Sequence, residues 1–235
     1  MTEPSIFTQY INKRQSLVKN KKVLQSSYIP NNLPHRSNEI NSIVEIIAPS
    51  LNKDKPSNIL IYGKTGTGKT AVMNYIGKEL RKADPTQENC CFIYMNCEVV
   101  GTPYGILHNI SDQIISDPDK KIPYTGLSLE KIFKDLKDII DSQNRIFIVV
   151  LDEIDRSFQT NGDDILYRLT TINDPVDGSS NTSETESLKN SKLSIIGITN
   201  NAKFTEFLSP KVKSRLGEEK IIFPPYSSKQ LQDIL

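Results

Sequence analysis

The sequence has few of the residues from which metal and redox sites are usually built. Its 235 residues include only three cysteines and two histidines. The cysteines, Cys90, Cys91 and Cys97, form no C-x-x-C pair, and an odd number with two adjacent suits neither a disulfide framework nor a zinc site. We expect them on one strand, partly facing the core. The histidines, His35 and His108, are too few and too far apart for a metal centre or a catalytic triad, and we interpret His108 as structural.

Long hydrophobic runs are absent as well. The longest, residues 146–151, is far shorter than the roughly 20 apolar residues that a membrane-spanning helix needs. The first residues include Glu3 and Pro4 where a signal peptide would have its basic start, and no apolar stretch follows them. We therefore predict a cytoplasmic protein without a membrane partner.

Positive and negative charges nearly cancel. Lysine and arginine together number 29 and aspartate and glutamate 28, which leaves a net charge of +1. This balance excludes a globally basic nucleic-acid-binding protein, so any DNA contact must come from a local patch. A basic stretch within residues 13–22 has two interpretations, the solvated face of a helix or a patch that contacts phosphates.

Short apolar segments alternate with amphipathic ones from Ser57 onward. Strands that are apolar throughout and alternate with helices indicate a parallel sheet covered on both faces, so the predicted fold class is α/β. The length suits one large domain or one and a half. We expect strands at 58–62, 91–96, 146–151, 193–199 and 220–223, and helices at 38–48 after a Ser37 cap, 69–82, 103–115, 128–140 and 163–171.

Two segments depart from this pattern. Residues 174–190 have no periodicity and are rich in Ser, Thr, Asn and acidic residues, which predicts a mobile surface loop. Ser227 or Ser228 is a candidate cap for a helix whose apolar face begins at Leu231 and then runs out of chain. We expect this helix to be the start of a second, truncated domain.

The strongest motif is the octapeptide GKTGTGKT at residues 63–70, which fits G-x-x-x-x-G-K-[ST] between a predicted strand and a predicted helix. Its glycines let the loop curl so that backbone N–H groups point at phosphates, and the helix N-terminus adds to the attraction. Lys69 can reach the β- and γ-phosphates, and the Thr70 hydroxyl can ligate Mg²⁺. An ordinary glycine-rich turn is the alternative, which the complete motif in this context disfavours. The residues expected to bind the nucleotide here are Gly63, Lys64, Thr65, Gly66, Thr67, Gly68, Lys69, Thr70 and Ala71.

A second motif follows the buried strand at 146–151. Asp152 comes at the strand end, where it can hold Mg²⁺ beside the phosphate loop, and Glu153 can deprotonate an attacking water. A strand that simply ends in a polar turn is the alternative, which the nearby phosphate loop makes less favourable. Asp155 and Arg156 can equally be the start of the next helix, so we leave them out of the catalytic set.

Two further polar residues are candidates. Asn200 follows the strand at 193–199 and can hydrogen-bond the γ-phosphate or the attacking water, although asparagine is common after strands. Arg215 ends a basic cluster at 210–215 and can reach a nucleotide held by a neighbouring subunit. From the residues alone, a surface arginine is the favoured interpretation of Arg215.

The order of these motifs resembles the AAA+ ATPases. Several stretches are more narrowly similar to the archaeal replication initiators related to origin-recognition-complex subunits and the cell-division-control loader. The stretches are YIPNNLPHR at 28–36, TPY at 102–104, VVLDEID at 149–155, DDILYRL at 163–169, IGITN at 196–200, FLSPKVKSRL at 207–216 and FPPY at 223–226.

This resemblance implies a five-stranded parallel sheet in the AAA+ order over residues 37–226. An N-terminal segment, 1–36, would carry an adenine-pocket motif, and 227–235 would begin a helical lid that is otherwise missing. Asn200 matches the family's sensor residue and Arg215 its arginine finger, acting in trans. The residues that the resemblance adds to the adenine pocket are Tyr28, Ile29, Pro34, His35, Arg36 and Tyr226.

The resemblance also implies a function. The chain would be the ATP-binding and slowly hydrolysing core of a DNA replication initiator, with ATP or ADP and Mg²⁺ as ligands and a nucleoid-associated location. Its expected partners are origin double-stranded DNA, mainly through domains absent here, other initiator subunits and the replicative helicase. The helix at 103–115 resembles an initiator-specific insertion that touches duplex DNA. A nucleotide-dependent loader or interaction module without sequence-specific DNA binding is the alternative, and a phosphate-loop kinase is a more distant one.

Overall fold

The computed structural model describes residues 30, 32–115, 117, 121–172 and 192–234. The chain divides into two units, Met1–Asn32 and Leu33–Leu235, and the fold described below is that of the second unit. The predictions for the basic stretch at 13–22, for Tyr28 and Ile29, and for the loop at 174–190 fall on residues outside these ranges.

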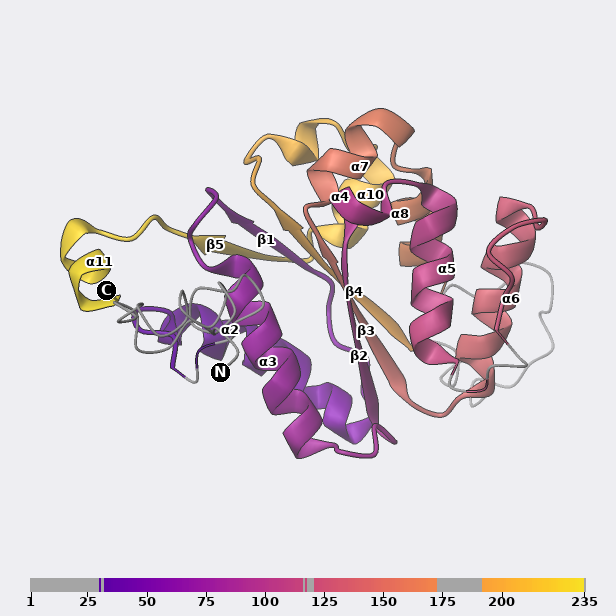
Figure 1. The fold of residues 1–235 in the computed structure, drawn as a ribbon, viewed down its shortest axis with the longest axis horizontal. Coiled ribbons are helices and arrows are strands. Elements are labelled where there is room, and N and C mark those ends of the chain that lie inside the picture. Colours follow the sequence, from indigo (N-terminus) through magenta and orange to yellow (C-terminus); the bar gives the residue numbers. More distant parts are fainter. Residues whose placement is uncertain (1–29, 31, 116, 118–120, 173–191, 235) are drawn as a thin grey trace, which may run out of the picture. The chain divides into compact units, whose positions relative to one another are not determined.

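A five-stranded sheet forms the centre of this unit (Figure 1). All four pairings between neighbouring strands are parallel, and the strand order is β2-β3-β4-β1-β5. The predicted α/β class and the predicted five-stranded parallel sheet are therefore confirmed. The strands are β1 (Ile59–Gly63), β2 (Cys90–Asn96), β3 (Ile146–Asp152), β4 (Leu193–Thr199) and β5 (Glu219–Phe223).

Helices cover both faces of the sheet, because successive side chains of the strands point to opposite faces and are apolar on both. The helices α2 (Ser37–Ile47) and α3 (Lys69–Ala83) pack on one face, where residues such as Ile59 and Ile61 meet Ile43 and Val72. The other face carries the remaining helices that contribute to the core (Figure 1). They are α4 (Cys97–Val100), α5 (Pro103–Ile114), α6 (Leu129–Ser142), α7 (Ile154–Asn161), α8 (Asp164–Thr171) and α10 (Pro210–Leu216).

Shorter elements complete the described chain. Two 3₁₀ helices, η2 (Ala48–Asn52) and η4 (Phe204–Glu206), follow α2 and β4, and α11 (Ser228–Ile234) follows β5. The predicted cap of α11 is present at Ser227, whose side chain accepts from the Gln230 amide at 3.3 Å. The helix α6 likewise begins after Ser128, whose Oγ accepts from the Lys131 amide at 3.2 Å.

Two local predictions were wrong. Ser37 is the first residue of α2 rather than its cap, because the helical conformation already begins there after Arg36. The three cysteines are buried as expected, but Cys97 starts α4 instead of continuing the strand. The strand ends at Asn96 because its side-chain oxygen accepts from the amides of Glu98 (2.8 Å) and Val99 (3.4 Å), which caps a helix.

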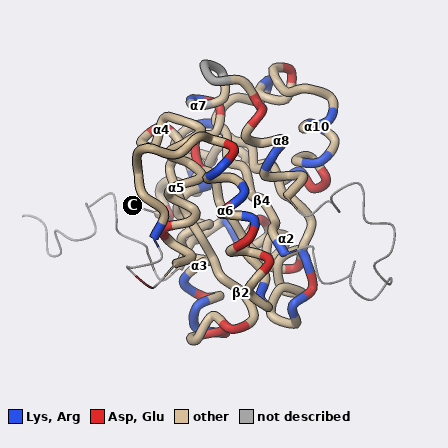
Figure 2. The backbone as a smooth tube through the Cα atoms, turned by 90° about the vertical axis from the view of Figure 1, so that its right-hand side faces the viewer, with Lys and Arg blue, Asp and Glu red and all other residues tan. Residues whose placement is uncertain are grey.

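Basic and acidic positions are intermingled along the described backbone in the view of Figure 2. This distribution agrees with the net charge of +1. Within the described ranges, no helix has the length and apolarity required to cross a bilayer.

Candidate nucleotide-binding site

The predicted phosphate loop joins β1 to α3 at the carboxyl edge of the sheet. Strands β1, β3 and β4 are parallel neighbours, so the residues that follow them gather at this edge, where α/β folds bind ligands. Gly66 and Gly68 have φ angles of +81° and +91°, a region that favours glycine. A Cβ atom on Gly68 would lie 3.0 Å from the Tyr226 hydroxyl oxygen, so the loop also needs glycine there for space.

Lys69 is held between the loop and the end of β4. Its Nζ donates to the carbonyls of Gly63 (2.8 Å) and Lys64 (3.0 Å) and to Asn200 Oδ1 (2.7 Å). The lysine is only 6 % exposed. The structure thus places two residues of the predicted catalytic set, Lys69 and Asn200, in direct contact.

The electrostatic environment of Lys69 combines burial with nearby carboxylates. Burial lowers the pKa of the Lys69 ammonium, and the negative charges of Asp152, Asp155 and Glu153 act in the opposite direction. A partly desolvated cation beside several carboxylates is an arrangement in which electrostatic interactions are stronger than in water.

The side chains of Thr70 and Asp152 meet across the site. Thr70 Oγ1 donates to Asp152 Oδ2 at 2.6 Å, and the Tyr94 hydroxyl donates to the same oxygen at 2.7 Å. Asp152 Oδ1 accepts from the Glu153 amide at 2.9 Å. Hydroxyl and carboxylate oxygens are the ligands that Mg²⁺ prefers, so this donor set fits the ion. Among the described residues, no group of three or more His, Cys, Asp or Glu side chains forms a metal site built from protein alone.

Glu153 occupies an unusual backbone conformation directly after β3. Its φ of 55° and ψ of 42° lie in the left-handed region, which is strained for a residue with a side chain and recurs at functional sites. A hydrogen bond with Glu98 raises the pKa of the Glu153 carboxyl, and burial and the negative charges of Glu98 and Asp152 raise it further. This carboxyl is therefore more basic than an ordinary glutamate.

The two residues left out of the catalytic set have other contacts. Asp155 is buried and accepts from Thr199 Oγ1 at 2.9 Å, which joins the start of α7 to the end of β4. Arg156 Nη1 lies 3.8 Å from Glu98 Oε1 in an exposed ion pair.

Arg36 connects the segment before α2 to the phosphate loop. Its Nε donates to the Thr67 carbonyl (2.9 Å) and the Tyr226 hydroxyl (3.0 Å), and Nη2 donates to the Pro224 carbonyl (2.7 Å). Its guanidinium also stacks on the Tyr226 ring, 4.0 Å from the centroid, and pairs with Glu39 at 2.7 Å. The structure therefore brings Arg36 and Tyr226, two predicted adenine-pocket residues, to the phosphate loop.

The other predicted adenine-pocket residues lie nearby in the chain. Pro34 and His35 form a turn before α2, and His35 Nε2 lies 3.2 Å from Asp233 Oδ2 of α11. The predicted contact of all these residues with adenine stays a prediction.

Replacement of Arg36 by alanine is expected to lower the free energy of unfolding by about 2–4 kcal/mol, because the partly buried Glu39 carboxylate and two carbonyls lose their donor. Urea unfolding without nucleotide measures this loss. Arg81→Ala is the matched control, since Arg81 is exposed and contacts Phe92 only at long range, with a 3.5 Å bond to its carbonyl and a distance of 5.9 Å to its ring centroid. We expect a change of about 0.5 kcal/mol or less. Equal losses in the two variants would contradict the connecting role.

Arg215 lies in the last turn of α10. Its Nη1 donates weakly to the Thr170 carbonyl of α8 at 3.4 Å, and its backbone carbonyl accepts from Asn58 Nδ2 at 3.0 Å. These bonds hold α10 against α8 and the start of β1. The proposed action of Arg215 on a neighbouring subunit stays a prediction.

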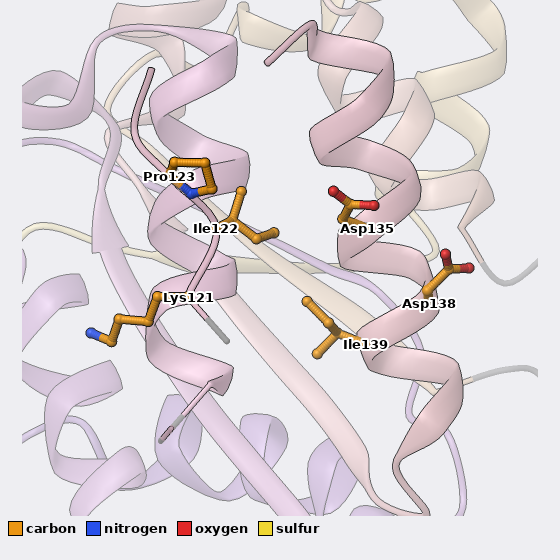
Figure 3. A pocket seen from close by; sticks show the side chains of 6 residues that line it. All are labelled: Lys121, Ile122, Pro123, Asp135, Asp138 and Ile139. Atoms are coloured by element: carbon orange, nitrogen blue, oxygen red, sulfur yellow. The ribbon is translucent and has the colours of Figure 1, made fainter. Parts of the chain in front are cut away.

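A separate pocket of about 350 Å³ lies between residues 121–123 and the helix α6 (Figure 3). Ile122 and Pro123 lie across from Asp135, Asp138 and Ile139 of α6. Two carboxylates are poor partners for nucleic-acid phosphates, so this pocket is no candidate for a DNA backbone contact. The predicted contact of α5 with duplex DNA is not tested by this geometry.

His108 of α5 has the structural position expected for it. Its Nε2 lies 2.9 Å from the Ile122 carbonyl, and its ring packs edge-on against Tyr124 with centroids 4.8 Å apart. These contacts fasten α5 to the segment before α6.

Sequence reasoning missed two residues of the site, Tyr94 and Glu98. Tyr94 carries a hydroxyl and lies between the apolar residues Ile93 and Met95 of a predicted buried strand. A polar group at such a position could have indicated a role in the site. Glu98 follows the helix cap Asn96, and nothing in the local sequence indicates that its side chain meets Glu153.

The fold and the site define a phosphate-loop NTPase of the AAA+ class. The family described as "AAA domain" matches residues 52–198, and the chain belongs to this family. Membership in it supports ATP or ADP binding and, in general, ATPase activity.

Curated relatives and solved structures show which AAA+ proteins the chain is similar to in sequence and fold. The chain is 45 % identical over 222 residues to "ORC1-type DNA replication protein 1" of Methanosarcina mazei, covering 94 % of this chain and 50 % of that protein. It is 42 % identical over 232 residues to "ORC1-type DNA replication protein" of Thermococcus onnurineus, covering 98 % and 53 %. The Aeropyrum pernix ORC1 protein, solved in complex with DNA, is 38 % identical with a TM-score of 0.78, covering 92 % of this chain and 52 % of that one.

These similarities confirm the resemblance to archaeal replication initiators that the motifs indicated. The chain spans about half the length of the relatives that it matches.

Proposed function

We propose that the chain is the ATP-binding and ATP-hydrolysing core of a DNA replication initiator that takes part in origin recognition and helicase loading. The observation that carries this proposal is the convergence of Lys69, Asn200 and the Thr70–Asp152 pair around a glycine-containing phosphate loop. The similarity to ORC1-type proteins supports the replication role.

In this proposal the phosphates of ATP bind to the backbone N–H groups of the loop and to Lys69. The Lys69 ammonium exchanges its present neutral acceptors, two carbonyls and the Asn200 amide oxygen, for phosphate oxygens, which is favourable because those oxygens carry negative charge. Bound Mg²⁺ would supply positive charge to the phosphates, and Thr70 and Asp152 are the residues that would hold it.

Hydrolysis uses the residues that follow β3 and β4. Glu153 accepts a proton from the attacking water, and its raised pKa suits a general base. Asn200 orients the water or the γ-phosphate. Arg215 of a neighbouring copy stabilises the charge that develops on the phosphates, so assembly and hydrolysis are coupled.

The remaining proposals concern adenine, DNA and protein partners. Adenine lies against Pro34, His35, Arg36 and Tyr226. The intact protein binds origin duplex DNA, other initiator subunits and the replicative helicase, and it resides in the cytoplasm at the nucleoid. The relative from Aeropyrum pernix solved with DNA supports a DNA partner.

Two measurements test this function. Calorimetric titration of the chain with ATP and ADP in Mg²⁺ is expected to show binding, and absence of binding would contradict the nucleotide site. Footprinting of the intact protein on chromosomal DNA is expected to show sequence-selective protection. Capture of protein partners without any selective protection would instead favour the nucleotide-dependent loader or interaction module.

A further inference from the structure

Tyr94 lies in the site without a part in the function described so far. The parallel register of β2 and β3 pairs Tyr94 with Val150 and Asn96 with Asp152. Because side chains alternate along strands, Tyr94 and Asp152 emerge on the same face of the sheet, on neighbouring strands and two positions apart. This diagonal placement lets the long tyrosine side chain reach the carboxylate.

Three donors determine the orientation of the Asp152 carboxylate. The Tyr94 hydroxyl and Thr70 Oγ1 donate to Oδ2 at 2.7 and 2.6 Å, and the Glu153 amide donates to Oδ1 at 2.9 Å. The carboxylate is 2 % exposed, so water does not compete freely for these positions. Removal of any one donor leaves the carboxylate with more freedom to rotate.

We infer that Tyr94 is a positioning residue for Mg²⁺ binding, which acts by orienting the carboxylate of Asp152 through the hydrogen bond to Oδ2. The inference rests on the proposed function, because it concerns the metal that accompanies ATP. Partners that orient metal-binding carboxylates and histidines typically change metal affinity or activity by 10–100-fold when they are removed.

Thr70, the other donor to Asp152 Oδ2, cannot orient the carboxylate alone. The Thr70 hydroxyl is itself a proposed metal ligand, so its geometry changes when Mg²⁺ binds, whereas the Tyr94 hydroxyl has no such second role. The Tyr94 ring packs against the hydrophobic cluster that α2 and α3 share with the sheet, and phenylalanine would preserve that packing.

Tyr94→Phe therefore removes only the hydroxyl, with its bond to Asp152 and its contact with Thr70, and keeps the ring. We would measure ATP affinity by calorimetry at a series of Mg²⁺ concentrations and take the Mg²⁺ concentration at which the affinity reaches half of its increase as the midpoint. A parallel measurement in EDTA gives the affinity without Mg²⁺. The expected result is a midpoint for Mg²⁺ about tenfold higher than in the wild-type chain, with affinity in EDTA unchanged within twofold. Thermal unfolding of the nucleotide-free proteins checks that both are folded.

Tyr62→Phe is the matched control, because Tyr62 also lies on a strand of the sheet, β1, and its hydroxyl bonds to Thr205 instead of Asp152. Its Mg²⁺ midpoint is expected to match the wild type. An unchanged midpoint in Tyr94→Phe would overturn the inference, and so would an equal loss of affinity in EDTA, which indicates a merely structural role. A wild-type chain that binds no nucleotide would overturn the proposed function as well, so the two failures are distinguishable.

Discussion

Lys69→Ala is expected to weaken the binding of ATP and ADP at least about a hundredfold. Hydrogen bonds to charged groups contribute about 1.5–3 kcal/mol each, and a loss of about 2.8 kcal/mol corresponds to a hundredfold change in Kd. The variant also removes the donor that the carbonyls of Gly63 and Lys64 share, so the loop loses part of what holds its shape. Isothermal titration in Mg²⁺ measures the loss.

Lys82→Ala is the control for this variant. Lys82 lies on the same helix, α3, but is exposed and pairs only with Glu79 at 2.7 Å, so nucleotide affinity should not change. Lys69→Arg separates charge from shape, because it keeps the positive charge while replacing the compact ammonium by a larger, planar group. Undiminished affinity in Lys69→Ala would be incompatible with a phosphate-binding role for this residue.

Glu153→Gln is expected to lower ATP turnover by about 10²–10⁴-fold, the range over which general-base catalysis contributes, while ATP affinity stays within about threefold. Glutamine has nearly the same shape and can occupy the same left-handed position, but it cannot accept the proton of the attacking water. Single-turnover hydrolysis of ATP, followed by phosphate release, measures the rate, and calorimetry measures binding.

Glu79→Gln serves as the control for loss of a carboxylate, because Glu79 is half-buried on α3, away from the phosphate loop in the chain, and pairs with Lys82 in a surface ion pair. Its turnover should equal that of the wild type. A Glu153→Gln chain that hydrolyses ATP at the wild-type rate would exclude Glu153 as the base and direct attention to other groups near the end of β3.

The parts of the site that the sequence predicted correctly are those encoded by consecutive residues. The phosphate loop spans eight positions, and the strand ending at Asp152 is a continuous apolar run, so both are visible without knowledge of the fold. The adjacency of β1 and β4, which brings Asn200 to Lys69, followed from the family order rather than from any local pattern.

Errors arose where a side chain competes with the backbone for hydrogen bonds. The three cysteines were expected on one strand, but the Asn96 side chain caps a helix that begins at Cys97. Alternation of hydrophobic residues reports burial, and it carries no information about such a local cap.

Arg36 illustrates the same limit over longer distances. Only the resemblance could assign Arg36 to the adenine pocket. Its hydrogen bonds connect it to residues that lie 31, 188 and 190 positions further along the chain. Those partners lie on the phosphate loop and on the segment after β5, which no spacing within residues 28–36 identifies.

By itself, then, the sequence determined the α/β class, the phosphate loop and the acidic pair at the end of β3, because each depends on neighbouring residues. Only the tertiary structure decided that Tyr94 holds Asp152 from 58 positions away, that Glu98 meets Glu153, and that Lys69 contacts Asn200 across 131 positions. A hydrogen bond needs its two groups within about 3 Å in a suitable orientation, and for residues so distant in the chain that condition is met by strand register and helix packing.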